Sequence, residues 1–296
     1  MSLVLRVALL FVFASASLAQ SVSEWGAPIN RATQTAPDAR IVILDARSGH
    51  LLASHQLRAA SATLAAPGST LKPLILFQAL QSNLWTAGRR VPCNGNLQIR
   101  NHRLACSHAP APPFAAREAI AWSCNTYFAA LARSLAPGQL DRMLRPTGLL
   151  GSTQLAPGEA LALFHSPSSA DEIQLTALGV EGIRVTPLAL AVAYRWLAQQ
   201  IAAAPNSIAS QTVLGGLADS ASFGIASQAR IAAVPVAGKT GTAETRGSQQ
   251  THGWFAGWAP ADNPQVVVVV YLPTGRGMDA AHIAGLLLAS SPVGHK

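Results

Sequence analysis

The chain has 296 residues, of which 50% are hydrophobic, 11% charged and 6% aromatic. This composition excludes a disordered chain and a coiled coil, and it is enough for one large core or two merged ones. A net charge of +8 is compatible with binding to nucleic acid. The arginines, however, are scattered and form no basic run, so we expect no nucleic-acid partner. A basic surface also suits an anionic polymer of the cell envelope, or it serves solubility alone.

Residues 1–19 have the pattern of a signal peptide. Arg6 supplies a positive charge, residues 7–13 are apolar, and Ser17 and Ala19 occupy the −3 and −1 positions of a cleavage site before Gln20. An uncleaved anchor is the alternative, although the apolar run is short for a membrane span. We therefore expect an exported protein of the periplasm or cell envelope, soluble or peripheral after cleavage.

An irregular leader over residues 20–39 is expected to precede one domain over residues 40–290, which ends in a tail at 291–296. The predicted strands are short apolar or alternating runs, and they are residues 40–45, 50–54, 236–242, 252–259 and 265–272. Between the second and third strands lies a mainly Ala- and Leu-rich helical insertion, over about residues 57–230. The clearest predicted helices are residues 71–80, 115–135, 187–203 and 278–290. We predict an α+β fold: a five-stranded antiparallel sheet with the terminal helix on one face and the insertion on another side.

Two lysines stand out because the chain has only three, and one of these is the C-terminal Lys296. Lys72 lies three residues after Ser69, at the start of the helix that follows the turn Pro67-Gly68, so both side chains share one helix face. A partly buried lysine can lose its proton and activate a serine hydroxyl, whereas arginine cannot. Taken alone, such a pair is usually no more than a helix cap and a solvated surface charge.

Two further stretches combine with Ser-x-x-Lys. Ser123-Cys124-Asn125 lies about fifty residues later, and taken singly it is explained by capping at a helix start. Lys239-Thr240-Gly241-Thr242 lies on the first of the late strands. In this order and spacing the three stretches form a known motif set. We expect them to meet at the seam between the helical part and the sheet.

The three cysteines fit an exported protein with one disulfide and one free thiol. Cys93 and Cys106 flank a loop that contains Gly and Asn, and we predict that they form the disulfide. Cys124 lies in an apolar helix, where a buried thiol acts as a small hydrophobic group. We expect no zinc site, because the sequence has no Cys-x-x-Cys spacing or histidine cluster.

Over residues 38–290 the chain resembles the transpeptidase domain of penicillin-binding proteins, within the serine β-lactamase and DD-peptidase superfamily. The stretches that carry the resemblance to the class B subgroup are residues 67–73, 123–128, 185–188, 238–244 and 252–260. Cys93 and Cys106 match a cysteine pair found in some of these proteins. We expect the chain to depart from that subgroup in having no counterpart of its large N-terminal pedestal domain and no convincing membrane anchor.

The resemblance implies a serine acyltransferase that acts on D-Ala-D-Ala stem peptides of peptidoglycan, as a DD-transpeptidase or DD-carboxypeptidase, and that penicillin acylates covalently. Ser69 would be the nucleophile, Lys72 its base, and Ser123 the group that relays a proton to the leaving amine. The residues implied to bind substrate are Asn125, Lys239, Thr240, Gly241 and Thr242. The resemblance implies no metal or cofactor, and other partners in wall synthesis stay unspecified.

Two alternatives remain open. A β-lactamase would need a group that activates water against the acyl-enzyme. Glu159, Glu172 and Glu181 lie in the right region for a class A glutamate but outside its pattern, and polar Asn125 disfavours the carbamylated lysine of class D enzymes. The other alternative is a β-lactam sensor or wall-binding module that is acylated at most once.

Overall fold

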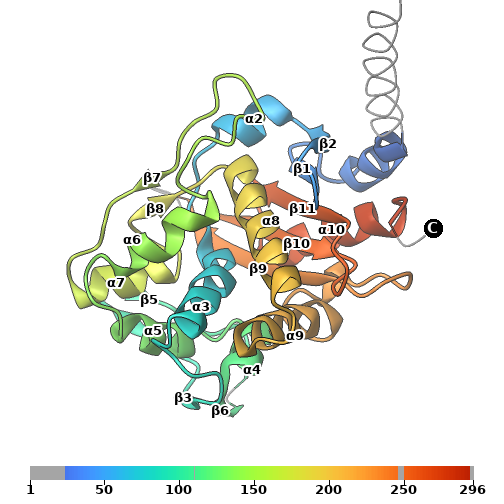
Figure 1. The fold of residues 1–296 in the computed structure, drawn as a ribbon. Coiled ribbons are helices and arrows are strands. Elements are labelled where there is room, and N and C mark those ends of the chain that lie inside the picture. Colours follow the sequence, from blue (N-terminus) through green and yellow to red (C-terminus); the bar gives the residue numbers. More distant parts are fainter. Residues whose placement is uncertain (1–23, 110, 246–249, 294–296) are drawn as a thin grey trace, which may run out of the picture.

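The computed structural model describes residues 24–109, 111–245 and 250–293. Its centre is the predicted five-stranded antiparallel sheet, and the structure shows the strand order β2-β1-β11-β10-β9 (Figure 1). The strands are β1 (Arg40–Asp45), β2 (Leu51–His55), β9 (Ala237–Glu244), β10 (Thr251–Ala259) and β11 (Val266–Leu272). The first hairpin therefore pairs with the last strand, and β9 forms the far edge, where it meets the helical region.

Alternation along the strands divides the core into two layers. On β1, Val42 and Leu44 face the helical region, whereas Ile41 and Ile43 face the opposite side. The 17-residue helix α8 (Pro187–Ala203) covers the first face, and α10 (Gly277–Ala289) covers the second. Both faces are buried, which explains why β11 is a continuous apolar run instead of an alternating one.

The helical region follows β2 and occupies most of the left half of the view in Figure 1. Its helices are α2 (Leu57–Ala62), α3 (Lys72–Gln81), α4 (Ala116–Ala121), α5 (Asn125–Arg133), α6 (Gln139–Leu144), α7 (Ala170–Ala177), α8 and α9 (Ile208–Ser222). Three short 3-10 turns are η1 (Gly68–Leu71), η2 (Arg145–Thr147) and η3 (Ser227–Ala229). Small two-stranded sheets pair β3 (Val91–Cys93) with β6 (Ala111–Phe114), β4 (Gln98–Ile99) with β5 (His102–Arg103), and β7 (Leu163–Phe164) with β8 (Ile183–Arg184), and of these only β4–β5 is a hairpin.

The structure corrects two predicted elements. Residues 24–33 of the expected irregular leader are helical, and Trp25 and Ile29 pack into the core layer under α10. The helix predicted over residues 115–135 is two helices, α4 and α5, separated at Ser123. The predicted signal peptide lies outside the described residues, and among those that are described no helix has the length and apolarity needed to cross a membrane.

Candidate active site

Ser69 lies in the tight turn η1, which runs directly into α3 and presents its half-buried side chain to the main groove of the molecule. Buried groups fix this turn from several sides. The Gly68 N–H donates to Gly179 O at 3.0 Å, and the Tyr194 hydroxyl donates to Thr70 O at 2.9 Å. These bonds hold the backbone on both sides of Ser69 in a rigid frame.

Two side chains of β10 hold the residue that leads into the turn. His252 Nε2 and Trp254 Nε1 both donate to the carbonyl oxygen of Ala66, at 2.8 and 2.9 Å. Burial lowers the pKa of His252 below its usual value, so that the ring is neutral and donates from Nε2. The sequence marked residues 252–260 by resemblance alone, and the structure shows what these two side chains do.

Lys72 connects the Ser69 turn to the second motif. Its Nζ, fully buried, donates to Ser123 O at 2.8 Å, to Ser123 Oγ at 3.3 Å and to Asn125 Oδ1 at 2.6 Å. Burial lowers the pKa of Lys72 to about 8, although the nearby thiols, with Cys124 first, act in the opposite direction. The structure therefore brings Ser-x-x-Lys and Ser-x-Asn together through an amine that can lose its proton.

Ser123 owes its position to an unusual backbone. Its φ of 56° lies in the left-handed region, which costs about 1–2 kcal/mol for a residue other than glycine. This conformation ends α4 and lets α5 start in a new direction, so that both the carbonyl and the hydroxyl of Ser123 point to Lys72. Asn125, at the start of α5, also donates from Nδ2 to Ala105 O at 2.9 Å, which fixes its amide.

The third motif lies on edge strand β9. Lys239 is fully buried, and its Nζ donates to Thr240 O at 2.9 Å. Burial, and then the positive charge of Lys72, lower the pKa of Lys239 well below its usual value. Two buried lysines close enough to affect each other make this end of the groove attractive to a carboxylate.

Gly241 allows β9 to lie against the Ser69 turn. A Cβ atom at this position would be 2.5 Å from Pro67 O, a distance that packed side chains do not reach. The close approach of the motif strand to the turn therefore requires glycine at this position. On the other face of β9, the exposed Thr242 accepts a hydrogen bond at its Oγ1 from Gly277 N of α10, at 2.8 Å.

The motifs open onto a groove with a volume of about 1520 Å³. Its lining includes the proposed nucleophile Ser69 and four other predicted site residues: Ser123, Asn125, Thr240 and Thr242. Three arginines of the lining were not singled out from the sequence: Arg103, Arg184 and Arg276. No local pattern marks them, because each comes from a different part of the chain.

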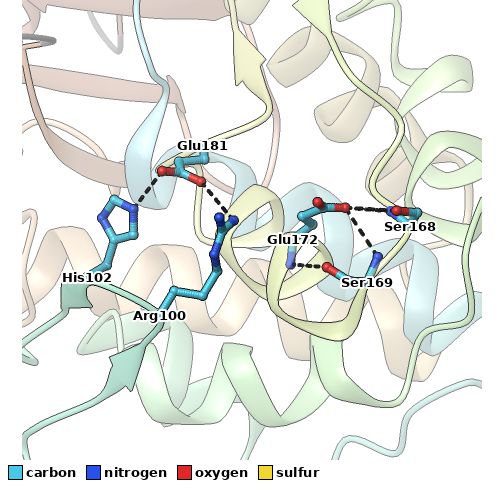
Figure 2. A network of polar contacts seen from close by, with 6 residues as sticks. All are labelled: Arg100, His102, Ser168, Ser169, Glu172 and Glu181. Atoms are coloured by element: carbon cyan, nitrogen blue, oxygen red, sulfur yellow. Dashed lines mark hydrogen bonds and ion pairs between the residues drawn. The ribbon is translucent and has the colours of Figure 1, made fainter.

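One rim of the groove is held by Glu181, which follows α7. Figure 2 shows its carboxylate accepting a hydrogen bond from His102 Nε2 at 2.7 Å and facing Arg100, whose Nη1 is 3.7 Å away. Both partners belong to the β4–β5 hairpin. Glu181 thus joins the hairpin to the segment after α7 across the mouth of the groove.

The other two glutamates considered as activators of water have structural partners away from the groove lining. Glu172 caps α7, where its carboxylate accepts from the backbone N–H groups of Ser168 and Ser169 (Figure 2). These bonds, with that from Ser168 N first, lower the pKa of Glu172. Glu159 accepts from the hydroxyls of Ser152 and Thr153.

The predicted disulfide is not formed. All three cysteines are free, and Cys93 Sγ and Cys106 Sγ are 3.3 Å apart, beyond the S–S bond length of about 2.05 Å. Cys124 is buried as predicted, but it lies beside the other two, and the ligand atoms of Cys93, Cys106, His108 and Cys124 are all within 4.8 Å of one another. Among the described residues these four could hold a metal ion, a grouping that sequence spacing did not indicate.

A family model for the penicillin binding protein transpeptidase domain matches residues 39–289. The peptidoglycan D,D-transpeptidase PbpA of Mycolicibacterium smegmatis is 27% identical over 263 residues, which are 77% of this chain and 53% of that protein. The peptidoglycan D,D-transpeptidase MrdA of Acinetobacter baumannii is 24% identical over 274 residues, which are 74% of this chain and 41% of that protein. The chain thus spans about half the length of these relatives, or less.

Solved structures support the same fold. A peptidoglycan glycosyltransferase from Burkholderia ambifaria superposes with a TM-score of 0.79 at 21% identity, covering 92% of this chain and 94% of that one. The TP domain of penicillin-binding protein 3 from Burkholderia pseudomallei has a TM-score of 0.79 at 20% identity, covering 92% and 93%.

Proposed function

The chain belongs to the penicillin-binding protein transpeptidase domain family, and on that premise we propose that it is a serine DD-transpeptidase or DD-carboxypeptidase of the cell envelope. Its substrate is the D-Ala-D-Ala end of a peptidoglycan stem peptide, and penicillin acylates it covalently. The observation that carries the proposal is the buried Lys72, which faces Ser123 and Asn125 at one end of a groove lined by Ser69.

In the first step, Ser69 Oγ attacks the carbonyl carbon of the penultimate D-Ala and gives its proton to neutral Lys72. The oxyanion of the tetrahedral intermediate is stabilised by the backbone N–H groups of Ser69 and Thr242, and removal of one such donor typically costs about 3 kcal/mol. The C–N bond then breaks, and the terminal D-Ala leaves as an amine with the proton that Lys72 returns through Ser123. Lys72 Nζ and Ser123 Oγ are 3.3 Å apart, a distance that suits this proton relay.

Substrate orientation follows from charge. The carboxylate of the terminal D-Ala binds at the end of the groove where Thr240 and Thr242 line the wall. Its negative charge stabilises the protonated form of the buried Lys239. Asn125 Nδ2 donates to a substrate carbonyl with the hydrogen that Ala105 does not use. In the second step, an amine of another peptide or a water molecule attacks the ester carbonyl, the ester bond breaks, and Ser69 regains its proton.

A serine β-lactamase is the second candidate, and it requires efficient activation of water. Glu159 and Glu172 are held by their own neighbours away from the groove lining, and Glu181 is tied to His102. Asn125 accepts a hydrogen bond from Lys72, which suits an amine and disfavours a carbamate there. These contacts favour an acyl-enzyme that water hydrolyses slowly.

Incubation with a labelled penicillin, followed by intact-mass measurement over time, tests the proposal. We expect one penicilloyl group per molecule, persisting for many minutes or longer. Rapid loss of the adduct with turnover of the drug would instead identify a β-lactamase. A protein that is acylated but releases no D-Ala from a stem peptide would be a β-lactam-binding module, and the absence of any adduct would contradict the proposal.

A further inference from the structure

The four sulfur and nitrogen ligand atoms beside the second motif come from three separate segments. Cys93 ends β3, Cys106 and His108 lie in the loop before β6, and Cys124 is the residue that precedes α5. Cys93 and Cys124 are buried, and Cys106 and His108 are half-buried. A disulfide between Cys93 and Cys106 would need only those two thiols. Here a third thiol and an imidazole also lie within 4.8 Å, and a disulfide does not explain their presence.

The sulfur atoms lie among hydrogen-bonding groups near the start of α5. Cys93 Sγ donates to Thr126 Oγ1 at 3.3 Å and accepts a hydrogen bond from Gly95 N at 3.4 Å. Cys106 Sγ lies 3.3 Å from Cys93 Sγ and 4.0 Å from Thr126 Oγ1, within hydrogen-bonding distance for sulfur in both cases. Once Cys93 gives up its proton, the Gly95 N–H and the Thr126 hydroxyl can both donate to its sulfur, as the outer partners of metal ligands do.

His108 is oriented as a ligand. Its Nδ1 lies 2.7 Å from the carbonyl oxygen of Ala109, which can only accept, so Nδ1 carries the hydrogen and Nε2 is left with its lone pair. Nε2 is 3.8 Å from Cys93 Sγ, and the ring packs edge-on against Phe114 at 4.8 Å between centroids. A backbone carbonyl on the far nitrogen is the usual outer partner of a metal-binding histidine.

We propose that Cys93, Cys106, His108 and Cys124 bind one zinc ion as a closed, tetrahedral Cys₃His site. Zn–S bonds of about 2.3 Å place the sulfur atoms of a tetrahedron about 3.8 Å apart, so the cluster needs only small shifts to close on the ion. Soft thiolates select zinc over magnesium or calcium. Binding releases the remaining thiol protons to solvent.

The site also has a place in the architecture of the groove. Cys124 lies between Ser123 and Asn125, both of which bond to Lys72. Zinc at Cys124 ties this motif to the loop of residues 104–109, to which Asn125 also donates through Ala105 O. The ion is therefore structural: it fixes the motif without touching substrate. The binding site itself does not depend on the proposed reaction.

The test uses the full chain purified under reducing, chelator-free conditions, with zinc measured by elemental mass spectrometry. We expect about one zinc per chain. After chelation, added Co²⁺ should produce thiolate-to-metal charge transfer and the intense visible bands of a tetrahedral site, and this readout needs no variant. His108→Ala should lower zinc affinity at least about tenfold, since loss of even an outer-sphere partner has effects of that size. His50→Ala, which changes an exposed histidine outside the cluster, is the matched control.

Two results would overturn the site: reduced protein that takes up neither zinc nor cobalt, and His108→Ala with unchanged affinity and an unchanged cobalt spectrum. Peptide mapping without reduction adds a third. A Cys93–Cys106 disulfide in freshly purified protein that, after reduction, still binds no metal would show that the cluster is a disulfide with a neighbouring thiol. The zinc readouts are independent of penicillin labelling, so either proposal can fail alone.

Discussion

Lys72 is the residue on which the proposed chemistry depends, because its Nζ is removed from solvent yet faces three oxygen acceptors. No ion pair between Lys72 and a carboxylate occurs among the described residues. Burial of a lysine without such a partner destabilises its charged form, and this is the condition under which lysine becomes a base. The scarcity of lysine in the sequence was therefore an informative signal.

Lys72→Arg should keep a positive charge but remove the base, since a guanidinium does not deprotonate. Loss of general-base assistance typically slows a reaction by about 10²- to 10⁴-fold, and we expect a fall of that size in the rate of penicilloylation. The rate can be followed with a fluorescent penicillin, with a thermal melt to confirm that the variant folds. Near-normal labelling of a folded variant would remove Lys72 from this role.

The acylation rate should also depend on pH through Lys72. Its pKa is lowered from 10.5 to about 8 by burial, and the neutral amine is the active form. Only about one molecule in ten has a neutral Lys72 at pH 7, so the rate should rise with pH and level off above about 8. The second-order acylation constant measured from pH 6 to 9.5 tests this. A flat profile, or a rate that falls as pH rises toward 8, would contradict it.

At the scale of elements, the site depends on close contact between the Ser69 turn and β9. Substitution Gly241→Ala places a Cβ atom 2.5 Å from Pro67 O and must push the two apart. We expect a loss of stability of about 1–3 kcal/mol and a larger relative loss of acylation, because Lys239 moves with the strand. Gly26→Ala is the control: nothing lies within 4 Å of its Cβ position. Denaturant melts and labelling rates of both variants check the prediction, and equal effects of the two would contradict it.

Elements with strong local signals were predicted well from the sequence. Strand β1 (Arg40–Asp45) and helix α8 (Pro187–Ala203) have the predicted bounds, the latter because Thr186 caps the helix and Pro187 starts it. The break at Ser123 was missed, since it depends on a left-handed backbone that the contacts with Lys72 stabilise. Helix α9 was not among the clear predictions because Gly215 and Gly216 weaken its helical signal.

Contacts distant in sequence explain these failures. A Cβ at Gly216 would lie 2.7 Å from Ile120 Cβ, so this glycine is present for the close packing of α9 on α4, which local propensity does not reveal. The cysteines show the same limitation. Spacing suggested one pair, whereas the fold adds Cys124 and His108 to the same point. For the site, the sequence predicted the three motifs. It did not predict that side chains of β10 and of Tyr194 hold the Ser69 turn in place through hydrogen bonds to its backbone.

At the scale of the whole molecule, the groove lies where the helical region meets edge strand β9, so that each unit contributes part of the site. Its rim is braced by the contact of Glu181 with the β4–β5 hairpin. The carboxylates of its lining are Glu181 and Glu244, and the former has a partner on each oxygen. In the proposed function this groove binds a peptide, and the paired Glu181 is not free to activate a water molecule.

Hydrolysis of a chromogenic cephalosporin by the purified protein should therefore be negligible after the first equivalent, and added bicarbonate should not increase it. Glu181→Gln should leave the lifetime of the adduct within about twofold of the parent value, because its proposed function is to brace the rim. Absorbance of the cephalosporin, with and without bicarbonate, measures hydrolysis. Intact mass at successive times measures the lifetime of the adduct in the parent protein and in Glu181→Gln. Sustained rapid hydrolysis that Glu181→Gln abolishes would identify Glu181 as the activator of water and the protein as a β-lactamase.

The most direct test of the account is to locate the penicilloyl group. Protein labelled with penicillin is digested and mapped by mass spectrometry, and the variants Ser69→Ala and Ser82→Ala are treated in the same way. Ser82→Ala is the control, because it changes an exposed serine at the C-terminal end of α3, the helix that follows the Ser69 turn. We predict a single adduct on Ser69, absent from Ser69→Ala and unchanged in Ser82→Ala. An adduct on any other residue, or labelling that survives Ser69→Ala, would contradict the assignment of Ser69 as the nucleophile.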